Sequence, residues 1–330
     1  MRWFFFTVLI CVVGMGCDSA SPDPVVPQFA SPEQAQIVTT DVTRFWAAYD
    51  EAYASDRTFL ERAAIFERAY LNLGTPALDD LVDVRLDNAT RLVSAIDRYP
   101  AYYAGTRPGM DLIVGPATEA AIRALYRELD GRYDEALFPD VSFVVGDMTK
   151  GGFVSRNGLI IGTELFARTA ATPVDELGTW HRAVTRFADD VLFIVAHELV
   201  HAQQLALRTS SSRTLLAQAI IEGSADYVGE LLAGGHVNEH VHVYGDAHEA
   251  DLWAAFAGAM NGTDWSAWLY NGAQATEERP ADLGYYIGYQ ITAAYFERVG
   301  NPDEALRDLF EATDFTAFLE ASGYAAQFDS

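Results

Sequence analysis

Apolar residues recur at every third or fourth position over most of this chain, and this spacing places them on one face of an α-helix. The first such run ends at Gly74-Thr75-Pro76, and Pro100 and Pro139 stand just after the next two. Beyond the first run, the spacing predicts helices over residues 77–98, 117–137, 175–207, 214–233, 246–261, 283–299 and 303–322.

The pattern changes between residues 139 and 166. Residues 141–145 form a β-branched run, and Asn157-Gly158 separates two further apolar runs at 152–155 and 159–161. An Asn-Gly pair between such runs is the strongest short-range signal for a β-hairpin. The chain is therefore predicted to fold as a predominantly α-helical α+β protein, with a small antiparallel sheet just before the helix at 175–207.

The N-terminus is typical of an exported protein. One basic residue precedes a solid apolar run, and small residues then lead to Cys17. Residues 14–17, Gly-Met-Gly-Cys, resemble a bacterial lipobox, which implies that residues 1–17 are a lipoprotein signal and that Cys17 carries the lipid. The alternatives are an ordinary cleaved signal and an uncleaved anchor. Residues 18–35, rich in Pro, Ser and Ala, are predicted to be a flexible tether. Residues 36–330 are predicted to form one domain, with an N-terminal helical part over about 36–110.

Composition restricts the partners and the chemistry. The chain has 22 basic and 47 acidic residues, so its formal net charge is −25, which repels nucleic acid phosphates and excludes nucleic acid as a partner. Half of the residues are apolar, which is enough for a packed core. Cys11 and Cys17 are the only cysteines, so no thiolate metal site or disulfide is available beyond Cys17.

The chemistry of the chain is concentrated in the sequence HELVH at residues 197–201. On a helix, residues four apart lie on the same face, so His197 and His201 can present two imidazoles to one ion. Glu198 lies about 100° round the helix, where it can reach a metal-acidified water without being a ligand. Neutral imidazoles suit zinc, and the carboxylate can act as the base, so Zn²⁺ is the expected cofactor.

A catalytic zinc needs a third protein ligand and an open fourth position. Glu222 lies on the next predicted helix, and the Ser/Thr-rich turn between the two helices would let them pack antiparallel. Asp226 falls on the same face as Glu222 and can accept the second ring proton of His197, which would fix the tautomer of that histidine.

These residues resemble the gluzincin class of zinc metallopeptidases, whose fold is best known from thermolysin. The class has HExxH on one helix and Glu on the next, with Asp four residues later, which implies zinc ligands at His197, His201 and Glu222, the base at Glu198 and a supporting carboxylate at Asp226. A narrower resemblance, over roughly residues 135–324, is to predicted zinc-dependent proteases related to gliding-motility lipoproteins. The segments that carry the narrower resemblance are NGLIIGTELF, HELVHAQQ, IIEGSADYVGELLAGG, WLYNG and RPADLGYYIGYQI.

Peptide hydrolysis builds negative charge on the carbonyl oxygen, so a hydrogen-bond donor is expected opposite the metal. Tyr286 and Tyr289 are the candidates for this role, and the alternative for each is a place in an aromatic core. The hairpin at 152–161 is the candidate edge along which an extended substrate would lie, with an ordinary covering hairpin as the alternative.

A second group of histidines follows the predicted helix at 214–233. His240 and His242 alternate as on a strand and could form an auxiliary metal site. A loop of surface histidines, with His236 and His248, is the interpretation that the spacing favours, since no partner carboxylates hold a clear ligand spacing.

The sequence thus predicts an exported, lipid-anchored zinc metallopeptidase of the bacterial cell envelope, with a peptide or protein substrate. The same motif is also compatible with a zinc-dependent hydrolase that cleaves an amide bond other than a peptide bond. The main alternative is an envelope lipoprotein with an assembly or gliding-motility role, in which the metal is structural or vestigial. The intact Glu198 favours catalysis, because a structural zinc has no need of it.

Overall fold

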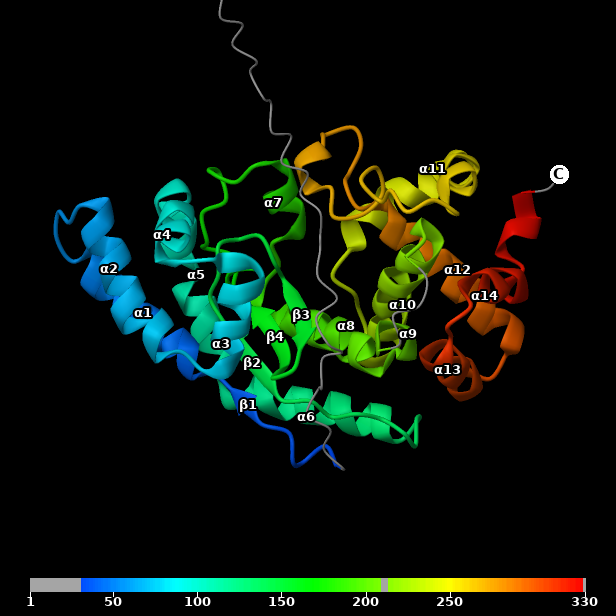
Figure 1. Ribbon diagram of the computed structural model, residues 1–330, viewed down its shortest axis with the longest axis horizontal. Helices are drawn as coiled ribbons and strands as arrows, with labels where there is room; N and C mark the ends of the chain where they lie inside the picture. Colours follow the sequence, from blue (N-terminus) through cyan, green and yellow to red (C-terminus); the bar gives the residue numbers. More distant parts are fainter. Residues whose placement is uncertain (1–30, 209–212, 329–330) are drawn as a thin grey trace, which may run out of the picture.

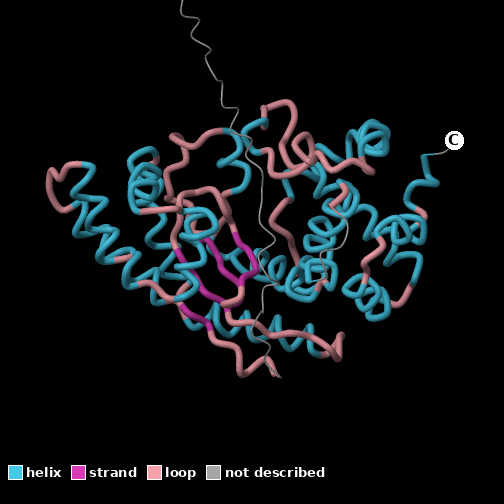
Figure 2. The backbone as a smooth tube through the Cα atoms, viewed as in Figure 1, coloured by secondary structure: helices cyan, strands magenta, loops and turns pink. Residues whose placement is uncertain are grey.

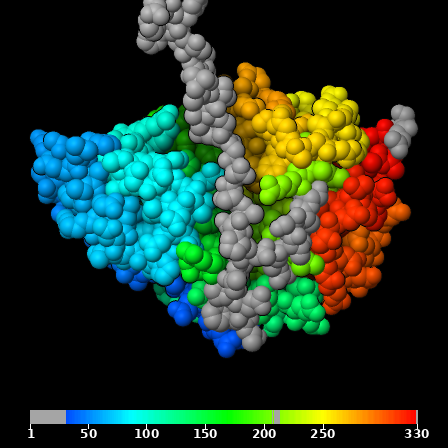
Figure 3. Space-filling model, viewed as in Figure 1, coloured from blue at the N-terminus to red at the C-terminus, as the bar shows by residue number. Residues whose placement is uncertain are grey.

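The computed structural model describes residues 31–208 and 213–328, and helices dominate it (Figure 1). The predicted signal, Cys17 and most of the predicted tether lie outside these residues. In the space-filling view the N-terminal helices occupy one flank and the C-terminal helices the other (Figure 3). No helix among the described residues is long and apolar enough to cross a membrane.

Between residue 31 and the main part of the sheet lie six helices, and local sequence signals set their ends. Thr58 and Glu61 form a capping box at the start of the second, and the Asn88 side chain caps the fourth. The helices are α1 (Thr40–Tyr53), α2 (Phe59–Ala69), α3 (Pro76–Leu81), α4 (Ala89–Arg98), α5 (Pro100–Ile113) and α6 (Pro116–Asp130).

The single helix predicted over 77–98 is wrong. A π-helical turn, η2 (Val82–Leu86), and a left-handed Asp87 with a φ of 68° interrupt it, and α4 then starts afresh. Pro100 begins α5 instead of only closing the preceding helix, because proline is well suited to the first helical position.

The strands, magenta in Figure 2, form one sheet, which within the described residues has four strands in the order β1-β2-β4-β3. The strands are β1 (Ile37–Val38), β2 (Val141–Val144), β3 (Gly152–Ser155) and β4 (Gly158–Gly162). The predicted hairpin is confirmed as the antiparallel pair β3–β4. The prediction of a wholly antiparallel sheet is wrong, because the hairpin reverses the chain and β4 therefore runs parallel to β2. The strand β3 is left at the edge of the sheet.

The C-terminal helices follow the predicted runs, with breaks. The region predicted as one helix over 175–207 is divided before the HELVH helix, and that over 303–322 is divided where the Asp314 side chain caps a new helix. These helices are α7 (Thr179–Val184), α8 (Val191–Gln203), α9 (Leu205–Arg208), α10 (Leu215–Ala233), α11 (Glu239–Ala259), α12 (Leu283–Val299), α13 (Pro302–Glu311) and α14 (Phe315–Ser322).

Three buried helices position the site. Helix α8 contacts β3 and β4 on one side and α10 on the other, and α10 also packs along α12. The contact between α10 and α12 is very close, since a Cβ atom on Gly288 would lie 1.7 Å from the Ala219 carbonyl oxygen. A Cβ atom on Gly223 would lie 2.1 Å from the Tyr289 nitrogen. Glycine at these two positions therefore lets α10 lie close to α12, in the place where α10 carries Glu222.

Candidate metal centre

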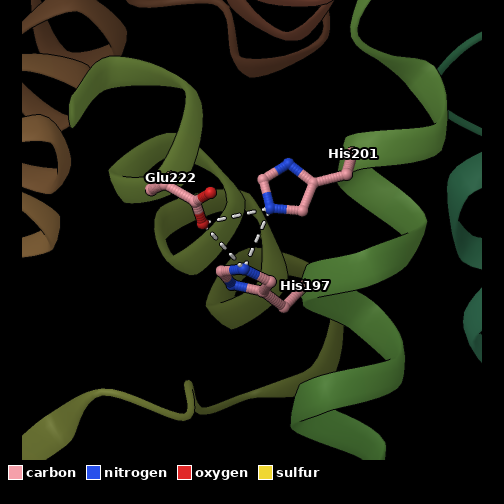
Figure 4. A group of neighbouring side chains, drawn as sticks. All are labelled: His197, His201 and Glu222. Atoms are coloured by element: carbon pink, nitrogen blue, oxygen red, sulfur yellow. Dashed lines mark hydrogen bonds and ion pairs between the residues drawn. The ribbon is translucent and has the colours of Figure 1, made fainter. Parts of the chain in front are cut away.

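His197, His201 and Glu222 meet in a buried cluster, with the two histidines on α8 and the glutamate on α10 (Figure 4). The two Nε2 atoms are 3.0 Å apart, and Glu222 Oε2 lies 3.4 Å from His197 Nε2 and 3.2 Å from His201 Nε2. Ligand atoms held about 2.1 Å from a tetrahedral zinc ion are about 3.4 Å from one another. The three predicted ligands therefore have the spacing that zinc requires.

Hydrogen bonds at the far side of each ring fix both tautomers. His197 Nδ1 lies 2.8 Å from Asp226 Oδ1, and a carboxylate can only accept there, so Nδ1 carries the proton. His201 Nδ1 likewise donates to Gln204 Oε1 at 2.8 Å, and the amide of Gln204 donates to the Ile221 carbonyl and the Ser224 hydroxyl. Both Nε2 atoms thus face Glu222, where each can hold either a proton or a shared metal ion.

The pKa values of the residues in the cluster also reflect its capacity to hold a proton or a metal ion. Burial alone would lower the pKa of His197, but its hydrogen bonds to Asp226 and Glu222 raise that pKa to about 10. Burial opposes the charged form of Glu222, yet the charge of His201 and the hydrogen bonds of both histidines hold the pKa of its carboxyl well below the usual value. Protons and a metal ion would therefore compete for the same three donor atoms.

Glu198 is 4% exposed, and its carboxylate has no hydrogen-bond or ion-pair partner among the described residues. A buried carboxylate without a partner is costly unless it meets water or a ligand. Its side chain lies against the backbone of Gly152 on β3, where an added Cβ atom would be 2.6 Å from Glu198 Oε1. Glu198 thus faces a cavity of about 650 Å³ that the three metal ligands also line.

Two tyrosines line the cavity beside the cluster. The Tyr270 hydroxyl donates to Glu222 Oε1, and Tyr270 has a left-handed φ of 55°, which is unusual for a bulky residue. The Tyr285 ring stacks on His197 with a centroid separation of 6.2 Å. Burial and the charge of Glu222 raise the pKa of Tyr285 well above its usual value, so its hydroxyl keeps its proton and can donate.

Tyr286 and Tyr289 lie elsewhere, which corrects their predicted position. Neither lines the cavity. Tyr286 is fully buried and its ring lies 5.3 Å from that of His242, as in the core alternative. Tyr289 is one turn beyond Tyr285 on α12 and therefore lies further along the helix than the metal cluster. Its hydroxyl donates to Glu230 Oε2 at 2.7 Å.

The sequence left four contributors unassigned, namely Gln204, Asn238, Tyr270 and Tyr285. Gln204 belongs to the HELVHAQQ segment, and Asn238 donates to Asp226 Oδ2 at 2.8 Å and so steadies that carboxylate. Tyr270 belongs to the segment WLYNG, where Asn-Gly indicates a turn but not which helix the tyrosine meets.

The second histidine group is helical, not strand-like. His240 and His242 lie on α11, and the His242 ring packs 4.5 Å from those of His236 and Tyr289. Burial lowers the pKa of His240 to about 4, so this side chain is neutral at pH 7. Only His248 of this group is exposed, so the expectation of a surface loop fails for the other three. Among the described residues, His197, His201 and Glu222 alone bring three ligand atoms together.

Fold and site together define a mainly helical α+β protein with a potential three-ligand metal centre beside a free carboxylate. The model of the family described as gliding motility protein GldB matches residues 115–326, which is more than half of the chain, and the chain therefore belongs to that family. The match includes every residue of the metal cluster. The narrower resemblance to gliding-motility lipoproteins is thus confirmed, while the resemblance to zinc metallopeptidases stays a prediction. No curated protein and no solved structure matches the chain.

Proposed function

We propose that this protein is a zinc-dependent peptidase of the bacterial cell envelope. The observation that carries the proposal is the meeting of three donor atoms at zinc spacing with the unpartnered carboxylate of Glu198 in one cavity. The donor set of two imidazoles and one carboxylate is the set that catalytic zinc sites use, with a position left open.

His197, His201 and Glu222 hold the ion, and Asp226 and Gln204 keep both histidines in the tautomer that binds it. Zinc, when bound, acts as a Lewis acid toward a carbonyl oxygen and increases the acidity of water. Glu198 takes the proton from the water that attacks the scissile carbonyl and passes it to the leaving amine.

Tyr285 is the donor available to the carbonyl oxygen as its charge develops, since it lines the cavity beside the cluster and its hydroxyl keeps its proton. The segment Gly152–Val154 of β3 also lines the cavity, at the open edge of the sheet. An extended peptide that adds to this edge would bring its main chain past Glu198.

A second candidate function follows from the family. The description of the family names gliding motility, which favours an envelope lipoprotein with a role in assembly or motility. The metal would then be structural. The family description is also compatible with membrane anchoring through Cys17, the predicted lipidation site. Peptidase activity and a motility role are compatible if the cleaved substrate is part of the motility machinery.

The test uses the full chain loaded with zinc and a peptide library, with metal content measured on every sample. Wild-type protein is expected to bind one zinc ion and to cleave library peptides. Glu198→Gln is expected to keep the zinc and to lose at least 100-fold in rate, because the base is gone. Glu297→Gln, an exposed position on α12, is the matched control and should behave as wild type.

Two outcomes contradict the proposal. If the purified protein does not contain stoichiometric zinc, the cluster is not a zinc site. If Glu198→Gln hydrolyses peptides at the wild-type rate, Glu198 is not the base. Complementation separates the two candidate functions. Full rescue by Glu198→Ala in cells that lack the protein supports the structural role, and loss of rescue with normal protein levels supports catalysis.

A further inference from the structure

Two cations line the same cavity as the metal cluster, at the side formed by η2 and the loop before β3. Lys150 is the only lysine in the chain, and Arg85 belongs to the π-helical turn η2. Neither has a carboxylate within 4.0 Å or a hydrogen-bond partner in the described part of the chain. This contrasts with ten described arginines that pair with carboxylates.

The loop that carries Lys150 is held firmly in place. Two buried backbone N–H groups, those of Gly146 and Met148, donate to the Glu164 carboxylate, and His181 Nε2 lies 3.2 Å from the Met148 carbonyl oxygen. Met148 itself has a left-handed φ of 67°. Strained backbone of this kind persists where surrounding contacts fix it, and it is frequent at binding sites.

Arg85 also comes from unusual backbone. A π-helical turn replaces the α-helix at residues 82–86, and turns of this kind are frequent at functional sites. The turn ends at Asp87, whose φ of 68° is again left-handed. Both cations of the cavity are thus presented by segments that depart from regular structure.

The charge balance in the cavity differs from that of the whole molecule. The chain has a formal net charge of −25, and, apart from the histidines of the metal cluster, the charged side chains in the cavity wall are Arg85, Lys150, Glu198, Glu222 and Asp282. A divalent metal ion balances the two glutamates. Burial raises the pKa of Asp282, and its carboxylate is already satisfied by the backbone N–H of Asn271 and the indole of Trp180. The two cations therefore remain for a ligand.

Lys150 is also close in sequence to the residue that contacts the proposed base. It stands two residues before Gly152, whose backbone contacts Glu198. Residues of an extended segment are about 3.3 Å apart, so a substrate residue beside Lys150 is two or three residues from the bond that is cut.

We propose that this cavity selects peptides that carry a carboxylate close to the scissile bond, and that Lys150 and Arg85 bind that carboxylate. This inference rests on the proposed function for the scissile bond, but the preference for a carboxylate is a property of binding and can be measured alone. The carboxylate can belong to an Asp or Glu side chain or to the C-terminus of the substrate.

The experiment measures binding to the zinc-loaded Glu198→Gln protein through tryptophan fluorescence, since Trp180 lines the cavity. The probes are acetylated and amidated alanine hexapeptides in which one Glu is moved through every position, the matching Gln peptides, and acetylated alanine hexapeptides with a free C-terminus. At least one carboxylate peptide is expected to bind about tenfold more tightly than its neutral match, as for a charge-assisted hydrogen bond. The peptide series that contains the tightest binder identifies whether a side chain or a C-terminus supplies the carboxylate.

Variants assign the preference to the two cations. Lys150→Met with Arg85→Gln should abolish the preference and leave binding of the neutral peptide unchanged. Lys150→Arg should retain it, and Arg307→Gln, an exposed arginine on α13, should have no effect. Equal binding of charged and neutral peptides by the starting protein overturns the inference, as does a preference that survives the double substitution. Failure of wild-type hydrolysis with a preserved preference would instead count against the peptidase proposal alone.

Discussion

Glu164 is the residue where burial and charge conflict most clearly outside the metal cluster. It is 1% exposed, and burial raises the pKa of its carboxyl to about 7, although it accepts hydrogen bonds from Gly146 and Met148. The same carboxyl supports the loop that carries Lys150. Its protonation state therefore matters for stability near neutral pH.

The sign of this pH dependence can be worked out. The pKa of Glu164 is above its ordinary value of 4.5, so the folded state holds the proton more strongly than the unfolded state does. The free energy of unfolding is thus expected to fall as pH rises from about 4.5 through 7, by roughly 3 kcal/mol at most. Glu164→Gln should lack this contribution. Urea unfolding at pH 5 and pH 8 should show the stability difference between wild type and variant moving in favour of the variant at pH 8.

The control for this measurement is Glu297→Gln, which removes an exposed carboxyl. It should follow wild type at both pH values. An equal change in stability between pH 5 and pH 8 for wild type and Glu164→Gln would show that Glu164 does not titrate in this range.

At the scale of single residues, the sequence predicted those parts of the site that depend on spacing within a helix. His197 and His201 are four apart on α8, and Glu222 and Asp226 are four apart on α10. Tyr270 could not be placed in this way, because its contact with Glu222 depends on the path of a loop between two distant helices. The prediction of Tyr289 failed for a related reason. Periodicity shows on which face of a helix a residue lies, but not at which turn of the helix another element makes contact.

At the scale of elements, the contact between β3 and α8 determines the position of Glu198, the proposed base. Gly152→Ala would place a methyl group 2.6 Å from Glu198 Oε1 and 2.7 Å from its Cγ atom, so the carboxylate must move. We expect the variant to keep its zinc, because the ligands are on α8 and α10, and to lose about 100-fold in kcat/KM. Metal analysis together with peptide hydrolysis measures both effects.

A matched control comes from Gly258→Ala on α11, where an added Cβ atom meets nothing within 4 Å. It should leave kcat/KM unchanged. Full activity of Gly152→Ala would mean that Glu198 has room to adjust, and the close contact would then have no part in positioning the base.

The predicted elements failed mainly where the chain changes direction without a strong apolar signal. Helix α12 was predicted at its observed bounds, because its ends coincide with the ends of the apolar pattern. The parallel pairing of β2 with β4 was not predictable from local patterns, since any strand alternates in the same way whichever direction its neighbour runs. The breaks at η2 and Asp314 depend on single residues within otherwise continuous helical patterns.

At the scale of the whole molecule, a bound metal would connect two halves of the core. The proposed ligands come from α8, which packs on the sheet, and from α10, which packs on α12. An ion held by both helices binds the folded state and not the unfolded one, so it must stabilise the entire domain. At a zinc concentration 100 times the Kd, this stabilisation is about 2.7 kcal/mol.

Removal of zinc by a chelator is therefore expected to lower the Tm by several degrees, and added zinc should restore it. Calorimetry on the full chain, with and without chelator, makes this measurement. His201→Ala should have the low Tm under both conditions, because one ligand is missing. His248→Ala, an exposed histidine on α11, should respond to zinc as wild type does. If the Tm of wild type is the same with and without zinc, α8 and α10 hold their positions without an ion, and the cluster is not a metal site in the folded protein.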